Sequence, residues 1–161
     1  MQRIRAFPLR EPTESPRGPV RHFSELIAYR KSFVVAAHVF ELSRAWPAPE
    51  RYSLTDQVRR SSRSIGANIS EAWAKRRYPA HWISKLTDSD GETNETEHWL
   101  ACALQHGYIS DADFAAMQSE LAQIGKLLGA LISKPHLFCG RPPAGCDPVT
   151  RRNLPEVGPN P

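Results

Sequence analysis

The stretch from Ser110 to Pro135 reads SDADFAAMQSELAQIGKLLGALISKP, and it decides the fold class. Its large apolar side chains recur at alternating spacings of three and four residues, the pattern of one buried stripe along an α-helix. Ser110 and Asp113 have the spacing of an N-terminal capping box, and Lys134-Pro135 supplies a stop. The expected stripe is Phe114, Met117, Leu121, Ile124, Leu128 and Leu131. So narrow a stripe predicts a helix packed nearly parallel or antiparallel to its neighbours.

Three segments upstream of this helix also show helical periodicity. The first runs over about residues 24–45 and stops at Pro47, the second opens at Ser53 as an expected cap, and the third starts at Pro79 and stops at Gly107. Their expected inward stripes are Leu26, Phe33, Ala37 and Phe40; then Leu54, Val58, Ser62, Ile65, Ile69 and Trp73; then Ile83, Leu86, Asp90, Asn94, Glu97, Ala101 and Leu104. Four such helices with short connections predict an all-α, antiparallel up-down-up-down four-helix bundle.

The two ends of the chain differ from this helical middle. The chain contains 14 prolines, and most of them lie near its ends. Residues 1–21 are rich in Pro, Arg and Glu, and residues 135–161 break into Pro, Gly and Arg without periodicity. Such segments bury too little apolar surface to offset the entropy of ordering them. We therefore expect a bundle at residues 22–134 between disordered tails at residues 1–21 and 135–161.

The composition indicates a cytoplasmic protein with a slightly basic surface. The net charge of +4 and the pI near 9.2 suggest an anionic partner, although a solvated surface gives the same balance. Cys102, Cys139 and Cys146 have no CxxC spacing, which argues against a disulfide framework and a thiolate zinc site and favours a reduced setting. We find neither a secretory signal nor an apolar run of the roughly 18 residues that a membrane span needs.

The third helix carries polar residues where its core face is expected. Asp90, Asn94 and Glu97 fall on the inward line, and burying such groups unpaired costs several kcal/mol. Either they form a hydrogen-bonded layer inside one bundle, or this face packs against a neighbouring subunit. Three large tryptophans, a residue type typical of interfaces, favour the second alternative. The candidate residues of an oligomer interface are Trp73, Trp82, Trp99, Asp90 and Asn94.

The second helix carries a basic cluster, whereas acidic residues crowd the third. Two interpretations stay open: electrostatic pairing between helices or subunits, and a stripe that binds phosphates. Arg59 is a weaker phosphate contact because it has acidic neighbours to satisfy. The candidate nucleic-acid-binding residues are Arg60, Arg63, Lys75, Arg76 and Arg77.

The sequence predicts no catalytic residue, no metal site and no cofactor. Glu95-x-x-His98 is half of a di-iron bundle motif, but the chain has no second Glu-x-x-His. Residues 86–97 approach a calcium loop, yet Leu86 stands where the first aspartate ligand is needed. Neither GxxxxGK[ST] nor GxGxxG occurs. The chain is therefore expected to be nonenzymatic, and a metal-dependent bundle enzyme has only the half-motif in its favour.

The stretch from Tyr52 to Ala72, YSLTDQVRRSSRSIGANISEA, resembles the signature of the ribosomal-RNA intervening-sequence proteins. That family shows a tyrosine and a leucine at the helix start, then Gln-x-Arg-Arg, Ser-Ile and Asn-Ile-x-Glu, all of which are present here. Phe23-x-x-Leu26 and Gly107-Tyr108-Ile109 are similar to further family landmarks, so the resemblance covers about residues 23–133. The chain departs from the family pattern by Ala72-Trp73 in place of a glycine, and by Gly91 in an acidic third helix.

The resemblance implies a left-handed antiparallel bundle, often assembled as a homopentameric barrel with a basic surface. Many members are encoded within insertions in large-subunit rRNA genes and have no established activity. A related branch serves diversity-generating retroelements as an accessory protein that binds reverse transcriptase and its RNA. The expected function is therefore a homo-oligomeric module that binds RNA, or a nucleoprotein such as a reverse transcriptase, through a basic surface. The alternative is a protein-only adaptor without nucleic-acid contact.

Overall fold

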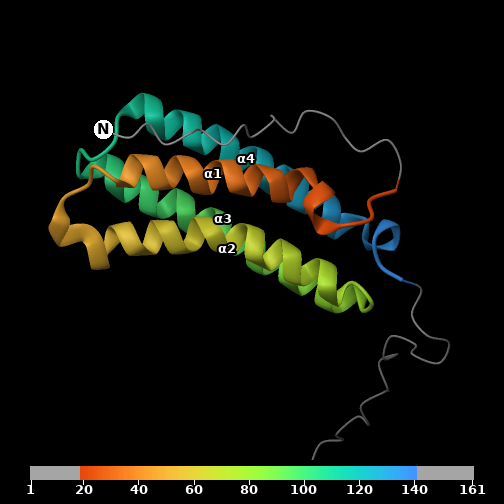
Figure 1. Ribbon diagram of the computed structural model, residues 1–161. Coiled ribbons are helices and arrows are strands. Elements are labelled where there is room, and N and C mark those ends of the chain that lie inside the picture. The colour runs from red at the N-terminus through yellow and green to blue at the C-terminus, as the bar shows by residue number, and fades with distance from the viewer. Residues whose placement is uncertain (1–18, 141–161) are drawn as a thin grey trace, which may run out of the picture.

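Four long helices form the body of the protein in the computed structural model, which describes residues 19–140 (Figure 1). Short 3-10 helices lie before, between and after them. The elements in chain order are η1 (Phe23–Glu25), α1 (Ile27–Ser43), η2 (Ala48–Tyr52), α2 (Leu54–Lys75), α3 (Pro79–Gln105), α4 (Asp111–Ser133) and η3 (Pro135–Leu137). The predicted all-α four-helix bundle is confirmed.

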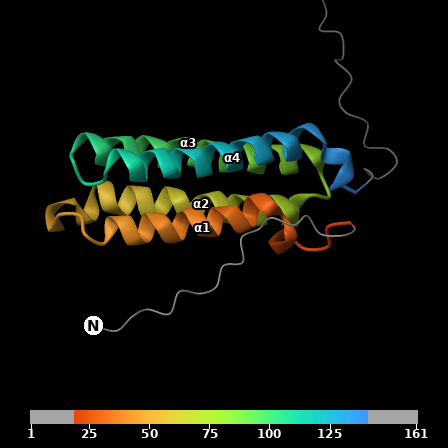
Figure 2. The ribbon, with the colours of Figure 1, turned by 90° about the horizontal axis from the view of Figure 1, so that it is seen from above.

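Each long helix packs against two others, so that the four occupy the corners of a square. The contacting pairs are α1 with α2, α2 with α3, α3 with α4, and α1 with α4, and the α2–α3 contact is the most extensive. Figure 2 shows α1 and α2 in one layer and α3 and α4 in the other. Consecutive helices run in opposite directions in Figure 1, which gives the up-down-up-down order.

The apolar stripes predicted for α2 and α4 lie in the core of the bundle. Along α2, Val58, Ile65 and Ile69 are fully buried, and Trp73 closes the stripe at the helix end. Four residues of the α4 stripe are buried: Met117, Leu121, Ile124 and Leu128. The capping box expected at the start of α4 is also confirmed, because the Asp113 backbone N–H donates to Ser110 Oγ over 3.1 Å.

The stripe predicted for α1 is wrong except at Leu26, which precedes the helix. Phe33 and Phe40 are 53% and 38% exposed, and Ala37 is exposed as well. The buried face consists of Ala28, Ser32, Val35, Val39 and Ser43. This helix is apolar on two sides, and its smaller side chains face inward because they let α1 lie close to α2.

The inward line of α3 lies one residue before the predicted one through the middle of the helix. Asn94 is exposed and Asp90 and Glu97 are half-buried, so the prediction that these three face the core is wrong. The buried line is Trp82, Leu86, Ser89, Thr93, Thr96, Leu100 and Ala103. Hydroxyl groups therefore fill the middle of the α2–α3 contact.

These buried hydroxyls all have hydrogen-bond partners. Ser89 Oγ donates to the Ile65 carbonyl over 2.9 Å, and Thr93 Oγ1 donates to the Ser89 carbonyl over 2.9 Å. Thr96 Oγ1 lies 3.0 Å from Ser61 Oγ. Because every hydroxyl is satisfied, the layer avoids the cost of burying unpaired polar groups.

The prediction that the C-terminal tail begins at residue 135 is also wrong. η3 continues the fold beyond α4, and the Phe138 ring stacks on Trp82 with ring centroids 5.4 Å apart and planes 18° apart. At the other end, Val20 packs against the core. Of the tails predicted at residues 1–21 and 135–161, the parts at residues 1–18 and 141–161 lie outside the described residues.

Helices α1 and α2 approach closely at Gly66. A Cβ atom at this position would lie 2.6 Å from Ser32 Oγ, closer than packed atoms tolerate. The Ser32 hydroxyl is itself held by donation to the Tyr29 carbonyl over 2.6 Å. Glycine therefore lets the two helices pack at their present separation.

Gly66→Ala is expected to destabilise the protein by about 1 kcal/mol, because the clash with Ser32 outweighs the gain in helix propensity. In the Ser32→Ala background the same change is expected to stabilise by about 1 kcal/mol, since only the propensity gain is left. Urea unfolding of the four proteins of this double-mutant cycle measures the coupling. Gly129→Ala in α4 is the control, because within residues 19–140 its Cβ would meet nothing within 4 Å beyond its own helix backbone and its chain neighbours. Equal effects of Gly66→Ala in both backgrounds would contradict the assignment.

Glu50 fixes the connection between α1 and α2. The Ser53 hydroxyl donates to Glu50 Oε2 and the Tyr108 hydroxyl donates to Oε1 over 3.3 Å. Ser53 consequently makes no side-chain cap on α2, so the cap predicted there is wrong. The hydrogen bond from Ser53, followed by those from the Leu54 backbone and Tyr108, lowers the pKa of the Glu50 carboxyl.

This lowered pKa predicts an acid-sensitive contribution to stability. A carboxyl whose pKa is depressed on folding stabilises the protein above its unfolded pKa, near 4.3, and this stabilisation is lost as the pH falls through the folded pKa. Glu50→Gln is therefore expected to lower the unfolding midpoint in urea at neutral pH, with a difference from the parent that shrinks in acid. Tyr108→Phe removes one of the hydrogen bonds and should act in the same direction to a smaller extent. A Glu50→Gln deficit independent of pH would contradict this role.

Candidate nucleic-acid interface

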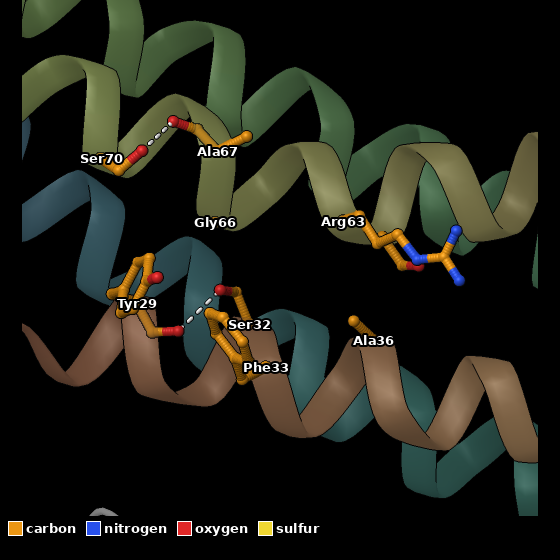
Figure 3. Close-up of a pocket in the computed structure, with 9 residues that line it drawn as sticks. Tyr29, Ser32, Phe33, Ala36, Arg63, Gly66, Ala67 and Ser70 are labelled. Atoms are coloured by element: carbon orange, nitrogen blue, oxygen red, sulfur yellow. Dashed lines mark hydrogen bonds between the residues drawn. The ribbon is translucent and has the colours of Figure 1, made fainter. Parts of the chain in front are cut away.

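A groove of about 260 Å³ runs along the outer surface between α1 and α2 (Figure 3). Small residues at the helix contact form most of its lining, and larger side chains stand at its sides. The lining residues are Tyr29, Ser32, Phe33, Ala36, Ser62, Arg63, Gly66, Ala67 and Ser70. Figure 3 shows Tyr29 and Phe33 on α1 and the Arg63 side chain extending from α2 along the space between the two helices.

The groove combines an exposed aromatic ring with an unpaired positive charge. Phe33 is 53% exposed, and Arg63 is exposed and forms no ion pair with any residue of 19–140. Within the described chain no carboxylate lines the groove. An anionic ligand in the groove is therefore attracted by Arg63 and is not repelled by a carboxylate of the lining.

Arg59, one turn before Arg63, is held by the protein itself. Its guanidinium carbon lies 4.8 Å from the centre of the Phe40 ring, and its Nε donates to Ser43 Oγ over 2.7 Å. The acidic neighbours expected for Arg59 from the sequence are replaced by an aromatic ring and a hydroxyl. This arginine extends the positive surface but is less free to reorient than Arg63.

The five candidate phosphate-binding residues form two separate groups. Arg60 and Arg63, the mid-helix arginines, are exposed near the middle of α2, where Arg60 donates to Gln57 Oε1 over 3.2 Å. Lys75, Arg76 and Arg77, the helix-end group, lie at the C-terminus of α2. At 1.5 Å per residue, the 12 residues from Arg63 to Lys75 correspond to about 18 Å along the helix. The structure therefore does not bring all five to one point.

Within the helix-end group, Arg76 is committed to the fold. It is half-buried, its guanidinium carbon lies 4.1 Å from the centre of the Trp73 ring, and Nη1 donates to the Trp73 carbonyl over 2.6 Å. Lys75 and Arg77 are exposed. Lys75 has Glu71 at 3.7 Å, and Arg77 lies over the Tyr78 ring at 5.8 Å. Lys75 and Arg77 are thus the accessible cations of this group.

Pairing between α2 and α3 uses a lysine rather than the arginines. Lys85 Nζ lies 3.1 Å from Glu71 Oε2 and 3.1 Å from Asp88 Oδ2. The hydrogen bonds that the Lys85 ammonium donates to Glu71 and then to Asp88 raise the pKa of Lys85. No ion pair in residues 19–140 joins an α2 arginine to an α3 carboxylate. Burial raises the pKa of the Glu92 carboxyl on α3, and the nearby charge of Arg60 opposes this rise without a direct ion pair. Direct pairing inside one protomer therefore leaves the guanidinium groups of both mid-helix arginines available to another partner.

Two of the three tryptophans proposed as interface anchors are core residues. Trp82 is 0% exposed and Trp73 is 8% exposed, so the prediction that they anchor an oligomer interface is wrong: both rings are already packed inside one protomer. Their rings meet edge to face at 6.5 Å, where α2 ends and α3 begins. Trp99 is half-buried and donates from Nε1 to Glu95 Oε1 over 3.0 Å, and it stays a predicted interface residue with Asp90 and Asn94.

Comparison with protein-family models matches residues 24–130 to the 23S rRNA-intervening sequence protein. The chain belongs to this family. The match spans all four helices except the last three residues of α4. It agrees with the family resemblance of the stretch from Tyr52 to Ala72.

A solved structure shares the family's fold with this chain. It is the crystal structure of a protein with unknown function from the S23 ribosomal protein family of Bacteroides thetaiotaomicron. The two chains are 30% identical with a TM-score of 0.60, and the match covers 66% of this chain and 96% of that one. No curated protein matches the chain.

The family assignment brings no catalytic centre with it, and the structure gathers no metal ligands in the part of the chain it describes. Glu95 of the di-iron half-motif accepts from Trp99, and His98 Nε2 lies 3.8 Å from Cys102 Sγ. No group of three His, Cys, Asp or Glu residues in 19–140 could hold a metal ion. Over the same residues, every helix is too short or too polar to cross a bilayer.

Phe33 is the groove residue that sequence reasoning missed. Phe33 and Phe40 are seven residues apart, which the periodicity assigns to a core stripe. Their helix also offers Ala28, Val35 and Val39 as an alternative inward face. The signal that could have separated the two faces is the small residue Gly66 on α2, which allows the close approach of Ser32 on the small-residue face of α1.

Proposed function

We propose that the protein is a nonenzymatic, oligomeric helical-bundle module that binds RNA through the basic surface of α2. The observation that carries the proposal is the pair of exposed arginines, Arg60 and Arg63, neither of which forms an ion pair with a carboxylate of residues 19–140, although the charge of Arg60 acts on Glu92 of α3 and opposes the rise in pKa that burial causes in that carboxyl. The net charge of +4 acts in the same direction. RNA is the anionic partner that the family resemblance of residues 52–72 implies.

The binding mechanism is electrostatic positioning of the RNA backbone. A guanidinium offers a rigid fork of N–H donors that matches two phosphate oxygens, and each contact releases condensed counterions. Arg63 and Arg60 would hold one part of the backbone, while Lys75 and Arg77 would hold another about 18 Å along α2. Oligomerisation would multiply such contacts, since each added copy raises the effective concentration of the next binding site.

The test is fluorescence anisotropy of a labelled RNA with the full chain at several salt concentrations between about 50 and 200 mM. Three or four phosphate contacts predict that log Kobs falls against log salt with a slope of about −2 to −4. Size exclusion with light scattering on the same samples reports the assembly. Absence of binding at the lowest salt, or binding indifferent to salt, contradicts RNA as the partner, and a monomer contradicts the oligomer.

A protein-only adaptor is the second candidate, and the exposed rings of Phe33 and Phe40 on α1 favour it. Exposed aromatic side chains of this kind serve as anchors in protein interfaces. The partner would then be a protein such as a reverse transcriptase, held without nucleic-acid contact. This function predicts a complex that survives nuclease treatment and an assembly that RNA does not shift.

A further inference from the structure

We propose that the groove between α1 and α2 holds an unpaired base of single-stranded RNA, stacked on Phe33 with the adjoining phosphate on Arg63. The inference rests on the proposed function and specifies which form of RNA the surface takes. Three observations support it: the shape of the groove, the packing of the Phe33 ring against Tyr29, and the positive charge of Arg63 in the lining.

The Phe33 ring is supported on one side and open on the other. Its centroid lies 5.1 Å from that of Tyr29, with a tilt of 56° between the planes. Tyr29 in turn packs edge-on against Phe23 at 4.8 Å and 79°. This row of rings fixes Phe33 while leaving it 53% exposed, which is the state of an aromatic platform that receives a nucleobase.

The bottom of the groove suits a flat ring. Gly66, Ala67 and Ser70 present little or no side chain on α2, and the volume of about 260 Å³ lies below the range of about 300–1,000 Å³ typical of drug-sized ligands. The Ser32 and Ser70 hydroxyls donate hydrogen bonds to the carbonyls of Tyr29 and Ala67, respectively. Their oxygens keep lone pairs that can accept hydrogen bonds from base N–H groups.

The charge of the groove favours a nucleotide over an apolar segment. Arg63 lines the groove without a counter-ion in residues 19–140, so an apolar helix laid over it would bury an uncompensated charge at high cost. A nucleotide instead brings a phosphate for the guanidinium and a π-face for the phenyl ring. A base inside a duplex is already stacked and cannot enter the groove, so single strands are selected.

The experiment compares three RNA probes of equal length on the full chain: a single-stranded oligouridylate, the same backbone with abasic residues, and a duplex. Phe33→Ala is expected to weaken binding of the oligouridylate about tenfold while leaving the abasic and duplex probes unchanged. Phe33→Trp retains a stacking surface and should bind the oligouridylate at least as well as the parent. Tyr52→Ala is the matched control, because Tyr52 is an aromatic residue 87% exposed outside the groove.

The outcomes separate this inference from the proposed function. If the parent binds RNA with the expected salt dependence but Phe33→Ala binds all three probes equally well, the groove assignment is overturned and the proposed function stands. An equal loss on the oligouridylate and abasic probes also overturns base stacking. A Phe33→Ala variant that changes the number of subunits in light scattering shows the groove to be a subunit interface and overturns the proposal. Failure of the parent to bind any RNA overturns the proposed function and this inference together.

Discussion

Trp82→Ala is expected to lower the free energy of unfolding by about 3–5 kcal/mol, a large fraction of the stability of a small domain. Trp82 is fully buried at the end of the bundle where α2, α3 and η3 meet. Its ring packs edge-on against Trp73 and stacks on Phe138, and its Nε1 donates to the Leu131 carbonyl over 3.3 Å. Alanine would remove all of these contacts and leave a cavity that rigid helices cannot close.

Urea unfolding followed by far-ultraviolet circular dichroism measures this loss. Trp82→Phe keeps an aromatic ring but no donor for the Leu131 carbonyl, so it should fall between the parent and the alanine variant. Trp99→Ala is the control at a half-buried tryptophan and should cost less. If Trp82→Ala costs no more than Trp99→Ala, the assignment of Trp82 to the core is incorrect. Dissociation of an oligomer without loss of protomer stability would restore Trp82 as an interface anchor.

Sequence periodicity predicted the helices that carry one clear apolar stripe. In α4 and α2 the large aliphatic residues occur on one side only, so one choice of inward face exists. In α3 the contact with α2 is made by Ser89, Thr93 and Thr96, which hydropathy scores as polar. Their hydroxyls are satisfied by Ile65, Ser61 and their own helix, and such pairing depends on a neighbour that periodicity does not include.

The C-terminal boundary shows a second limit of reasoning from composition. The chain from Pro135 to Pro161 is rich in proline, glycine and arginine, which predicts a tail. A single aromatic residue in that stretch, Phe138, finds a stacking partner in Trp82, which lies 56 residues earlier in the chain. One long-range contact of this kind orders a short segment without changing its average composition.

The sequence predicted the charged residues of the candidate site but not the groove beside them. Arginines on a surface helix are visible in the sequence, and Arg60 and Arg63 are indeed exposed. The groove beside them depends on the distance between α1 and α2, which Gly66 and Ser32 set through a contact across helices. That distance decides which face of α1 is buried, and so whether Phe33 belongs to the core or to the surface.

Replacing both mid-helix arginines, as Arg60→Gln/Arg63→Gln, is expected to weaken RNA binding about 25-fold in about 0.1 M salt. Each phosphate contact on a single strand contributes about 0.7 to the slope of log Kobs against log salt, so two contacts contribute about 1.4. Over the decade from about 1 M to 0.1 M salt this slope corresponds to the 25-fold loss. The unfolding midpoint should change little, because both side chains are exposed and neither forms an ion pair within residues 19–140.

Two further double variants locate the contacts. Arg44→Gln/Lys126→Gln removes the same charge from exposed positions outside α2, so it should change the slope much less if position matters more than net charge. Lys75→Gln/Arg77→Gln tests the helix-end group while sparing Arg76, whose stacking on Trp73 would confound binding with folding. A loss for this variant equal to that of the mid-helix pair means that the RNA spans both groups along α2. Equal losses for all three double variants would instead show a diffuse charge effect and contradict a specific phosphate contact at Arg60 and Arg63.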